Sequence, residues 1–275
     1  MPPVNNGYWG EPTATIDWCE ENYVYSYYIA EMTNTITNLI MIILPLWGIM
    51  EVIKQELDWR FIYLHSSILI VGLGSWAFHM TLLYGMQLFD ELPMIWGTCF
   101  LIYYLSEVQK SSFSKKMFSN QPLFIFLSLF AVIFTAIYLL WPQPLFQHIS
   151  YGVLVFTTVG MDLRLLKINE CKTCKKIFLI SAAIYLFGFI LWNLDKIFCQ
   201  NLRLLRLNIP GAFDPFTQLH GWWHLMSGYA SYSQVLFIIH ASYDFKNEKQ
   251  TRQNMELQTW RYGFSLGWFK KSHDL

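Results

Sequence analysis

Seven long apolar stretches constrain the fold of this chain more than any other feature. A helix needs about 20 apolar residues to cross the hydrocarbon core of a bilayer. Inside that core only helices and closed barrels satisfy every backbone polar group. The sequence therefore predicts an all-α membrane protein, a seven-transmembrane helix bundle with brief loops. The predicted spans are 34–53, 61–83, 88–108, 122–141, 145–163, 177–198 and 217–240.

Composition agrees with a membrane domain. Charged residues make up 14% of the chain, against about 25% in soluble domains. Aromatic residues reach 18%, and Trp and Tyr gather at membrane interfaces. Because 19 basic residues balance 19 acidic ones, the charge gives no sign of a nucleic-acid partner.

The distribution of Lys and Arg predicts the orientation of the bundle. Basic residues accumulate on the cytosolic side of membrane proteins. With seven spans, 16 of the 19 fall on the side of the C-terminus, and only Lys196, Arg203 and Arg206 fall on the other. The N-terminus is therefore predicted to be lumenal or extracellular and the C-terminus cytosolic. This divides the chain into a lumenal segment 1–33, a transmembrane catalytic domain 34–242 and a cytosolic tail 243–275.

Two pairs of cysteines fall on opposite sides of the predicted membrane. Cys19 and Cys199 are the only cysteines on the oxidising face, where a disulfide can tie the N-terminal segment to the end of the sixth span. Cys171 and Cys174 form a CxxC in a cytosolic loop. Without a second pair or nearby histidines, one CxxC is weak evidence for zinc, so two free thiols are expected there.

Three histidines at one predicted depth suggest a metal site. His220 and His224 are spaced i, i+4, so both rings lie on one helix face and can grip one ion. Alternatively, they are interfacial histidines among tryptophans. His79 near the lumenal end of the second span supplies a third ligand at the same depth. Three histidines leave a fourth position for water, the pattern of a catalytic zinc site.

Two polar residues accompany these histidines. Ser75 lies one turn below His79, where its hydroxyl could bind a substrate oxygen or its own i−4 carbonyl. Asp90 begins the third span near the same level and could serve as general base, as partner to a histidine or as helix cap. Glu91 points about 100° away and is the weaker candidate.

The other four histidines are predicted not to bind metal. His65 lies near the cytosolic end of its span, while His240 and His273 are cytosolic. His148 is the one competitor, because it is placed at the lumenal end of the fifth span.

The N-terminal segment is dense in oxygen ligands. Asp17, Glu20, Glu21 and Asn22 fall within six residues, and Glu31 follows at the entry to the first span. Such ligands suit calcium, although the 12-residue EF-hand pattern is absent. On composition alone, a solvated acidic segment is favoured.

From residue 7 to 240 the chain resembles the alkaline ceramidases, which form a wider group with the adiponectin receptors. The matches occur in order and at the spacing of the family. They are Gly7-Tyr-Trp-Gly10, Asp17-Trp-Cys-Glu-Glu-Asn-Tyr23, Tyr28-Ile-Ala-Glu31, Asn38-Leu-Ile-Met-Ile-Ile43, Gly74-Ser-Trp76, Phe78-His-Met-Thr-Leu82, Asp90-Glu-Leu-Pro-Met94, Trp192-Asn193, Asp195, Ile197-Phe-Cys199, and His220 to His224.

The resemblance implies a seven-helix hydrolase that cleaves the ceramide amide into sphingosine and a fatty acid. It implies zinc on His79, His220 and His224, with Ser75 stabilising the oxyanion and Asp90 acting on the water. It further implies a disulfide between Cys19 and Cys199, and an endoplasmic reticulum or Golgi membrane. The implied calcium ligands are Asp17, the carbonyl of Trp18, Glu20, Asn22 and Glu31, so activity is expected to be calcium-stimulated.

The alternative is a zinc-containing lipid receptor of the adiponectin-receptor type without turnover. Both classes share the three histidines, whereas the calcium ligands, Ser75 and Asp90 favour the enzyme. A channel is disfavoured because the ionisable residues collect at one face of the membrane. Apart from the ceramide-type substrate, the sequence predicts no obligate protein partner and no nucleic acid.

Overall fold

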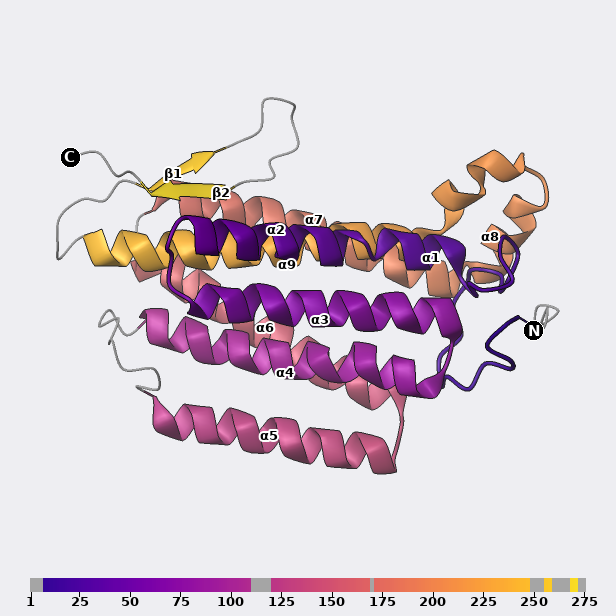
Figure 1. The fold of residues 1–275 in the computed structure, drawn as a ribbon, viewed down its shortest axis with the longest axis horizontal. Coiled ribbons are helices and arrows are strands. Elements are labelled where there is room, and N and C mark those ends of the chain that lie inside the picture. Colours follow the sequence, from indigo (N-terminus) through magenta and orange to yellow (C-terminus); the bar gives the residue numbers. More distant parts are fainter. Residues whose placement is uncertain (1–6, 110–119, 169–170, 248–254, 259–267, 272–275) are drawn as a thin grey trace. The chain divides into compact units, whose positions relative to one another are not determined.

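A computed structural model describes residues 7–109, 120–168, 171–247, 255–258 and 268–271 of the chain (Figure 1). These residues are predominantly helical. The helices are α1 Met32–Thr37, α2 Ile40–Lys54, α3 Arg60–Thr81, α4 Tyr84–Gln109, α5 Gln121–Leu140, α6 Pro144–Ile168, α7 Lys172–Ile197, α8 Cys199–Arg206, the 3₁₀ helix η1 Gly211–Thr217 and α9 Leu219–Asn247.

Among the described residues, five helical segments are long and apolar enough to cross a membrane, as expected of an integral membrane protein. The two other long helices, α4 and α9, are outside this set. The five segments are Met32–Lys54, Arg60–Thr81, Gln121–Leu140, Pro144–Ile168 and Lys172–Ile197.

Each predicted span overlaps helical residues, the first of them α1 and α2 together, although the ends differ. Helix α7 begins at Lys172 rather than at 177, and α9 continues to Asn247 rather than ending at 240. An apolar run predicts the part of a helix that lies in the hydrocarbon core of the membrane. Helical hydrogen bonding can continue into polar residues beyond that part.

The tail departs from the all-α prediction. Strands β1 Met255–Gln258 and β2 Trp268–Lys271 pair antiparallel, with Met255 opposite Lys271 and Gln258 opposite Trp268. Aromatic residues such as Trp268 and Phe269 favour strands, and no apolar run of helical length is present there.

The first predicted span is interrupted between α1 and α2. The side-chain amide of Asn38 donates to the carbonyl of Asn34 at 3.0 Å, and the hydroxyl of Thr37 donates to that of Thr33 at 2.8 Å. Such side chains compete with the backbone for hydrogen bonds and break or bend helices. Thr37, the last residue of α1, lies at the candidate site, where its hydroxyl is 3.1 Å from Nδ1 of His224.

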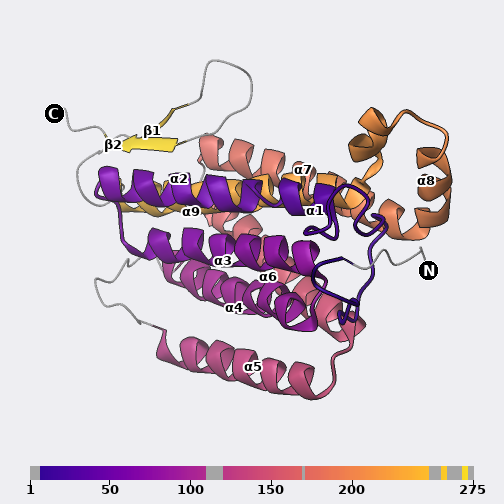
Figure 2. The same ribbon diagram turned by 45° about the vertical axis from the view of Figure 1, so that its right-hand side comes forward.

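Packing divides the chain into two compact units. The first comprises Met1–Pro45, Ile68–Pro93 and Ala182–Ser231, and the second comprises Leu46–Ser67, Met94–Ser181 and Tyr232–Leu275. In the first unit, helix α8 and the N-terminal segment lie at the same end as α1 (Figures 1 and 2). A cluster of buried apolar side chains underlies the N-terminal segment there. Its members are Trp18, Tyr23, Ala30, Phe78 and Leu82.

The second unit holds all of α5 and α6. Helix α5 runs beside α4, where the indole N–H of Trp96 donates to the hydroxyl of Thr135 at 3.0 Å (Figure 1). The rings of Phe178 on α7 and Phe237 on α9 lie 6.1 Å apart. This contact fixes the beginning of α7 against the second half of α9.

Candidate functional site

Three histidines from two helices of the first unit form a buried group. Helix α3 carries His79, and the first two turns of α9 carry His220 and His224. Their potential ligand nitrogens all lie within 4.8 Å of one another. The rings are 1%, 4% and 3% exposed in that order, so solvent hardly reaches them. Three imidazoles this close and this dry are suited to a shared ion.

Two of these rings are oriented by oxygen atoms from the start of the chain. Nδ1 of His79 lies 2.5 Å from a carboxyl oxygen of Glu31, and Nδ1 of His224 lies 3.1 Å from the hydroxyl of Thr37. The backbone of Glu31 also donates to the carbonyl of His79 at 3.0 Å. Metal-binding histidines usually donate their second nitrogen to such groups, which fixes the ring and its tautomer.

The environment of the third ring, that of His220, indicates whether the three histidines fit a metal ion. Nδ1 of His220 is buried and has no hydrogen-bond partner within the described residues. A buried polar atom without a partner is costly. An ion shared with His79 and His224 would account for the burial of three neutral imidazoles in one place, so the donor set fits zinc.

The N-terminal segment covers the histidines with an aromatic ring. The indole of Trp18 stacks on the imidazole of His220, with centroids 3.8 Å apart and planes inclined by 27°. The ammonium of Lys196 lies 4.8 Å from the centroid of Trp18 and 3.9 Å from that of Trp192. These cation–π contacts hold the indoles in place and shield the histidines from water.

Ser75 and Asp90 lie side by side on neighbouring helices. Gly74, which precedes Ser75 on α3, approaches the backbone of Asp90 on α4, so the two residues are close together. Ser75 is one helical turn from His79 and is 4% exposed. A donor and a proton acceptor therefore meet on the helix face that carries one of the histidines.

Gly74 and Pro93 bring these two helices together. Proline has no N–H, so Pro93 leaves the carbonyl of Phe89 without its usual helical donor. A Cβ on Gly74 would collide with that carbonyl oxygen and would lie 2.8 Å from the backbone nitrogen of Asp90. Only glycine at position 74 permits this approach of the two backbones.

We expect Gly74→Ala to destabilise the protein by about 1–3 kcal/mol, since an added methyl forces α3 and α4 apart. The matched control is Gly152→Ala on α6, where an added Cβ meets no atom of the described chain within 4 Å. The melting temperatures of both variants check this. Equal behaviour of the two would contradict the role of the close approach.

Acidic side chains next to the histidines are buried as well. Glu20 is 2% exposed and Glu31 is fully buried. The two carboxyl oxygens of Glu20 accept the backbone N–H groups of Thr33 and Asn34 at 2.7 and 2.8 Å, at the start of α1. Burial and the nearby charge of Glu31 raise the pKa of Glu20 to about 8. Burial, with the charge of Asp17, also raises the pKa of Glu31 well above its usual range.

This acidic cluster fits a hard cation. Oε1 of Glu31 and Oδ1 of Asn22 are buried, and neither has a hydrogen-bond partner in the described parts of the chain. Oxygen atoms in such an arrangement are calcium ligands in many proteins. Asp17 is exposed, so its carboxylate is the most accessible member of the set. The carbonyl of Trp18 accepts Nη2 of Arg203 at 3.1 Å and retains a second lone pair.

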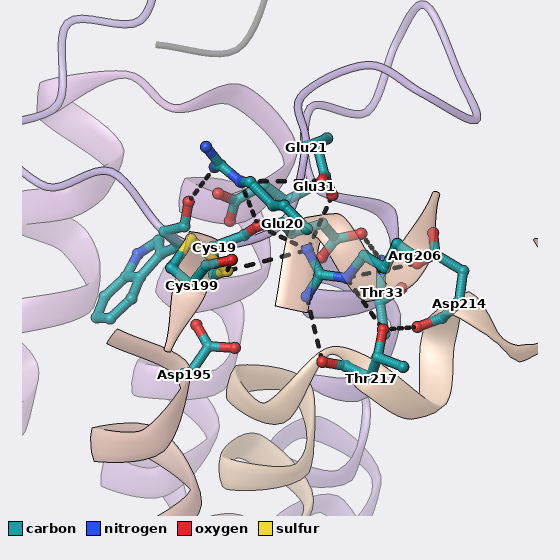
Figure 3. A network of polar contacts seen from close by, with 12 residues as sticks. Cys19, Glu20, Glu21, Glu31, Thr33, Asp195, Cys199, Arg206, Asp214 and Thr217 are labelled. Atoms are coloured by element: carbon teal, nitrogen blue, oxygen red, sulfur yellow. Dashed lines mark hydrogen bonds and ion pairs between the residues drawn. A yellow bond between two sulfur atoms is a disulfide. The ribbon is translucent and has the colours of Figure 1, made fainter. Parts of the chain in front are cut away.

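A disulfide and two arginines of α8 attach the N-terminal segment around Cys19 to that helix (Figure 3). Cys19 and Cys199 are joined, as the family resemblance implied, with Cα atoms 5.3 Å apart. Arg206 donates to the carbonyl of Cys19 at 2.8 Å and pairs with Glu21 at 2.9 Å. Arg203 donates to the same carbonyl at 3.1 Å. Lys196, Arg203 and Arg206, the three exceptions to the charge rule, thus all have local partners.

The remaining histidines are separate from this group. His65 is fully buried in the second unit, and neither His65 nor His148 belongs to a metal-ligating group of the described chain. His273 lies outside the described residues.

One expectation about the cysteines was wrong. Cys171 and Cys174 are joined rather than free, and His240 lies beside both sulfur atoms. No local pattern linked His240 to these cysteines, because 66 residues separate it from Cys174.

Other partners of the site had equally weak signals. Glu31 was expected only as a calcium ligand, and its contact with His79 spans 48 residues. Thr37 carried no signal beyond being a polar residue in a predicted span. Asp195, which is 1% exposed, accepts the backbone N–H of His220 at 3.4 Å and so caps the start of α9. The only sequence signal for Asp195 was that an acidic residue inside a predicted span is a candidate functional residue.

Apolar helices around a buried group of three histidines define a helical membrane protein with a candidate metal centre. Residues 10–269 match the family model described as Ceramidase. The chain is 43% identical over 234 residues to alkaline ceramidase 3 of Mus musculus, covering 85% of this chain and 86% of that protein. It is 34% identical over 251 residues to an alkaline ceramidase of Saccharomyces cerevisiae, covering 85% and 78%. The chain therefore belongs to the alkaline ceramidase family of enzymes.

Proposed function

We propose that this enzyme is a zinc-dependent intramembrane amidase that hydrolyses the amide bond of ceramides to sphingosine and a free fatty acid. The observation that carries the proposal is the convergence of three buried histidines in a chain whose relatives are alkaline ceramidases. The receptor reading has no comparable support, because the relatives are named as enzymes.

His79, His220 and His224 would hold the zinc ion. When bound, zinc supplies Lewis acidity and makes water acidic enough to lose a proton near neutral pH. Glu31 and Thr37 hold the rings of His79 and His224 in one orientation through Nδ1. The indole of Trp18 excludes bulk water above His220, which strengthens electrostatic interactions in the site.

Asp90 and Ser75 would carry out the proton transfer and the charge stabilisation. The carboxylate of Asp90 accepts a proton from water and passes it to the departing nitrogen of the amide. The hydroxyl of Ser75 donates a hydrogen bond to the carbonyl oxygen as negative charge develops on it. Their proximity across α3 and α4, and the position of Ser75 one helical turn from His79, support these roles.

The proposal places the site in a bundle of seven transmembrane helices with a lumenal or extracellular N-terminus. Helices α4 and α9 would be the two spans beyond the five apolar ones. Segment 1–33 would be lumenal, 34–242 the catalytic domain and 243–275 a cytosolic tail. A ceramide substrate never leaves the bilayer, so an intramembrane site lets the amide reach the histidines while both hydrocarbon chains stay in apolar surroundings. We place the enzyme in the endoplasmic reticulum or Golgi membrane.

Calcium would bind Asp17, the carbonyl of Trp18, Glu20, Asn22 and Glu31 and stimulate activity. The buried carboxylates of Glu20 and Glu31 need a compensating charge, and a divalent cation provides one. Because the same segment stacks Trp18 on His220, calcium would fix the cover of the catalytic site.

We expect Asn22→Ala to raise the calcium concentration for half-maximal activity by roughly tenfold, the effect of losing one oxygen contact worth about 1.4 kcal/mol. Oδ1 of Asn22 has no other partner among the described residues, so little else is lost. Calcium titrations of ceramide hydrolysis measure the shift. Asn208→Ala is the control, since Asn208 is exposed and, among the described residues, its side chain donates only to the carbonyl of Leu204 in the preceding helix α8. Identical titration curves for the two variants would contradict calcium ligation by Asn22.

The proposed function is tested with the purified chain in detergent. Release of sphingosine from ceramide is measured before and after removal of metal with a strong chelator, and again after one equivalent of zinc is restored. We expect activity to disappear and return with zinc. Protein that contains zinc but hydrolyses no ceramide at any pH or calcium concentration would overturn the proposal in favour of the receptor.

A further inference from the structure

A second group of metal-ligating side chains lies in the second unit, apart from the three histidines. It joins the beginning of α7 to the second half of α9. Nδ1 of His240 lies 3.4 Å from Sγ of Cys171 and 3.2 Å from Sγ of Cys174. The three donor atoms lie within 4.8 Å of one another, and Cys174 is 1% exposed. Packing of Phe178 against Phe237 holds the two helices at this point.

We propose that Cys171, Cys174 and His240 form a binding site for a thiophilic divalent metal ion, zinc in the cell, when the two cysteines are reduced. Two thiolates and one imidazole are the donors that zinc prefers. Three protein ligands leave the fourth position of a tetrahedral ion to water.

The position of Cys171 favours the thiolate form. It directly precedes α7, and its sulfur accepts the backbone N–H of Cys174 at 3.0 Å. The partial positive charge at a helix N-terminus stabilises an anion there, and thiols in such positions ionise more readily. Cys171 is thus prepared to ligate a cation before any ion arrives.

The disulfide is the metal-free state of the same site. Two molecules of a cellular thiol reduce it: the bond between the sulfurs of Cys171 and Cys174 breaks, each sulfur takes one proton, and the two reductant molecules become one disulfide. Zinc then displaces one proton from each thiol and binds the neutral ring of His240. On the side of the membrane that we propose is cytosolic, thiols are kept reduced. The reverse exchange, in which the disulfide of that cellular thiol is reduced to two thiols while Cys171 and Cys174 join, would release the ion.

The experiment uses the purified full-length chain and cobalt(II) as the probe. After reduction with a phosphine and removal of excess reagent, cobalt is added and unbound cobalt is removed. We expect a sulfur-to-cobalt charge-transfer absorption in the near ultraviolet, and about one more cobalt ion per chain than in unreduced protein. Histidine ligands alone do not give this band. It should vanish in Cys171→Ser/Cys174→Ser, fall sharply in His240→Ala, and persist in Cys99→Ser.

Unreduced wild-type protein provides a comparison that needs no substitution, and gel-filtration profiles show whether each variant folds. The proposal is overturned if reduced wild-type protein shows no such band, if the band survives in the double serine variant, or if His240→Ala leaves it unchanged. It is also overturned if alkylation shows that the phosphine leaves Cys171 and Cys174 joined. None of these results depends on ceramide hydrolysis, so failure here is distinct from failure of the proposed function.

Discussion

Replacing His220 by alanine is expected to remove the bound zinc and to lower ceramide hydrolysis by more than about 10⁴-fold, to the level of the background. The remaining His79 and His224 are on different helices and offer only two nitrogens, too few for a catalytic zinc site. Zinc per chain, measured by mass spectrometry, and release of sphingosine are followed in the same samples.

His148→Ala is the matched control for this variant. His148 was the competitor for the site in the sequence, yet it is in neither metal-ligating group of the described chain. Its replacement should leave zinc content and turnover close to wild type. If His220→Ala retains zinc, or if His148→Ala loses it, the assignment of the ligands is wrong.

The second large effect is expected for Asp90→Asn. The amide has the size of the carboxylate but cannot accept a proton, so the turnover number should fall by about 10²–10⁴-fold while zinc content stays unchanged. Retention of zinc separates loss of the proton acceptor from loss of the metal. The pH dependence of the residual rate gives an independent readout, because the limb due to ionisation of Asp90 should disappear.

Glu91→Gln provides the control next in sequence. Glu91 accepts a hydrogen bond from the side chain of Gln87 at 3.2 Å on the same helix, so its amide variant preserves the fold. We expect at most a small change in rate. A near-normal rate for Asp90→Asn, or an equal loss in Glu91→Gln, would exclude Asp90 as the proton acceptor.

Much of the fold was predictable because membrane helices are specified locally. About 20 apolar residues define a span whatever lies elsewhere in the chain. The close approach at Gly74 was not predictable, since it depends on atoms of another helix whose position follows from the fold. Helix α7 begins before its apolar run and α9 continues beyond its run, because backbone hydrogen bonding does not require apolar side chains.

The candidate site was predictable in its residues but not in its connections. The i, i+4 spacing of His220 and His224 specifies their common face, and His79 followed from its depth in the membrane. The structure brings the three rings together, while metal binding stays a prediction. No local rule links Glu31 to His79 or His240 to Cys171, because 48 and 69 residues separate these pairs. Such pairs arise only when helices pack.

Glu31 serves two proposed ions at once, since one carboxyl oxygen contacts His79 and the other has no hydrogen-bond partner among the described residues of the acidic cluster. If both ions bind as proposed, zinc and calcium would be thermodynamically linked through a single side chain. Any factor by which calcium tightens the binding of zinc would then equal the factor by which zinc tightens the binding of calcium. A change in the calcium concentration around the enzyme would thus also change how firmly it retains the proposed catalytic metal.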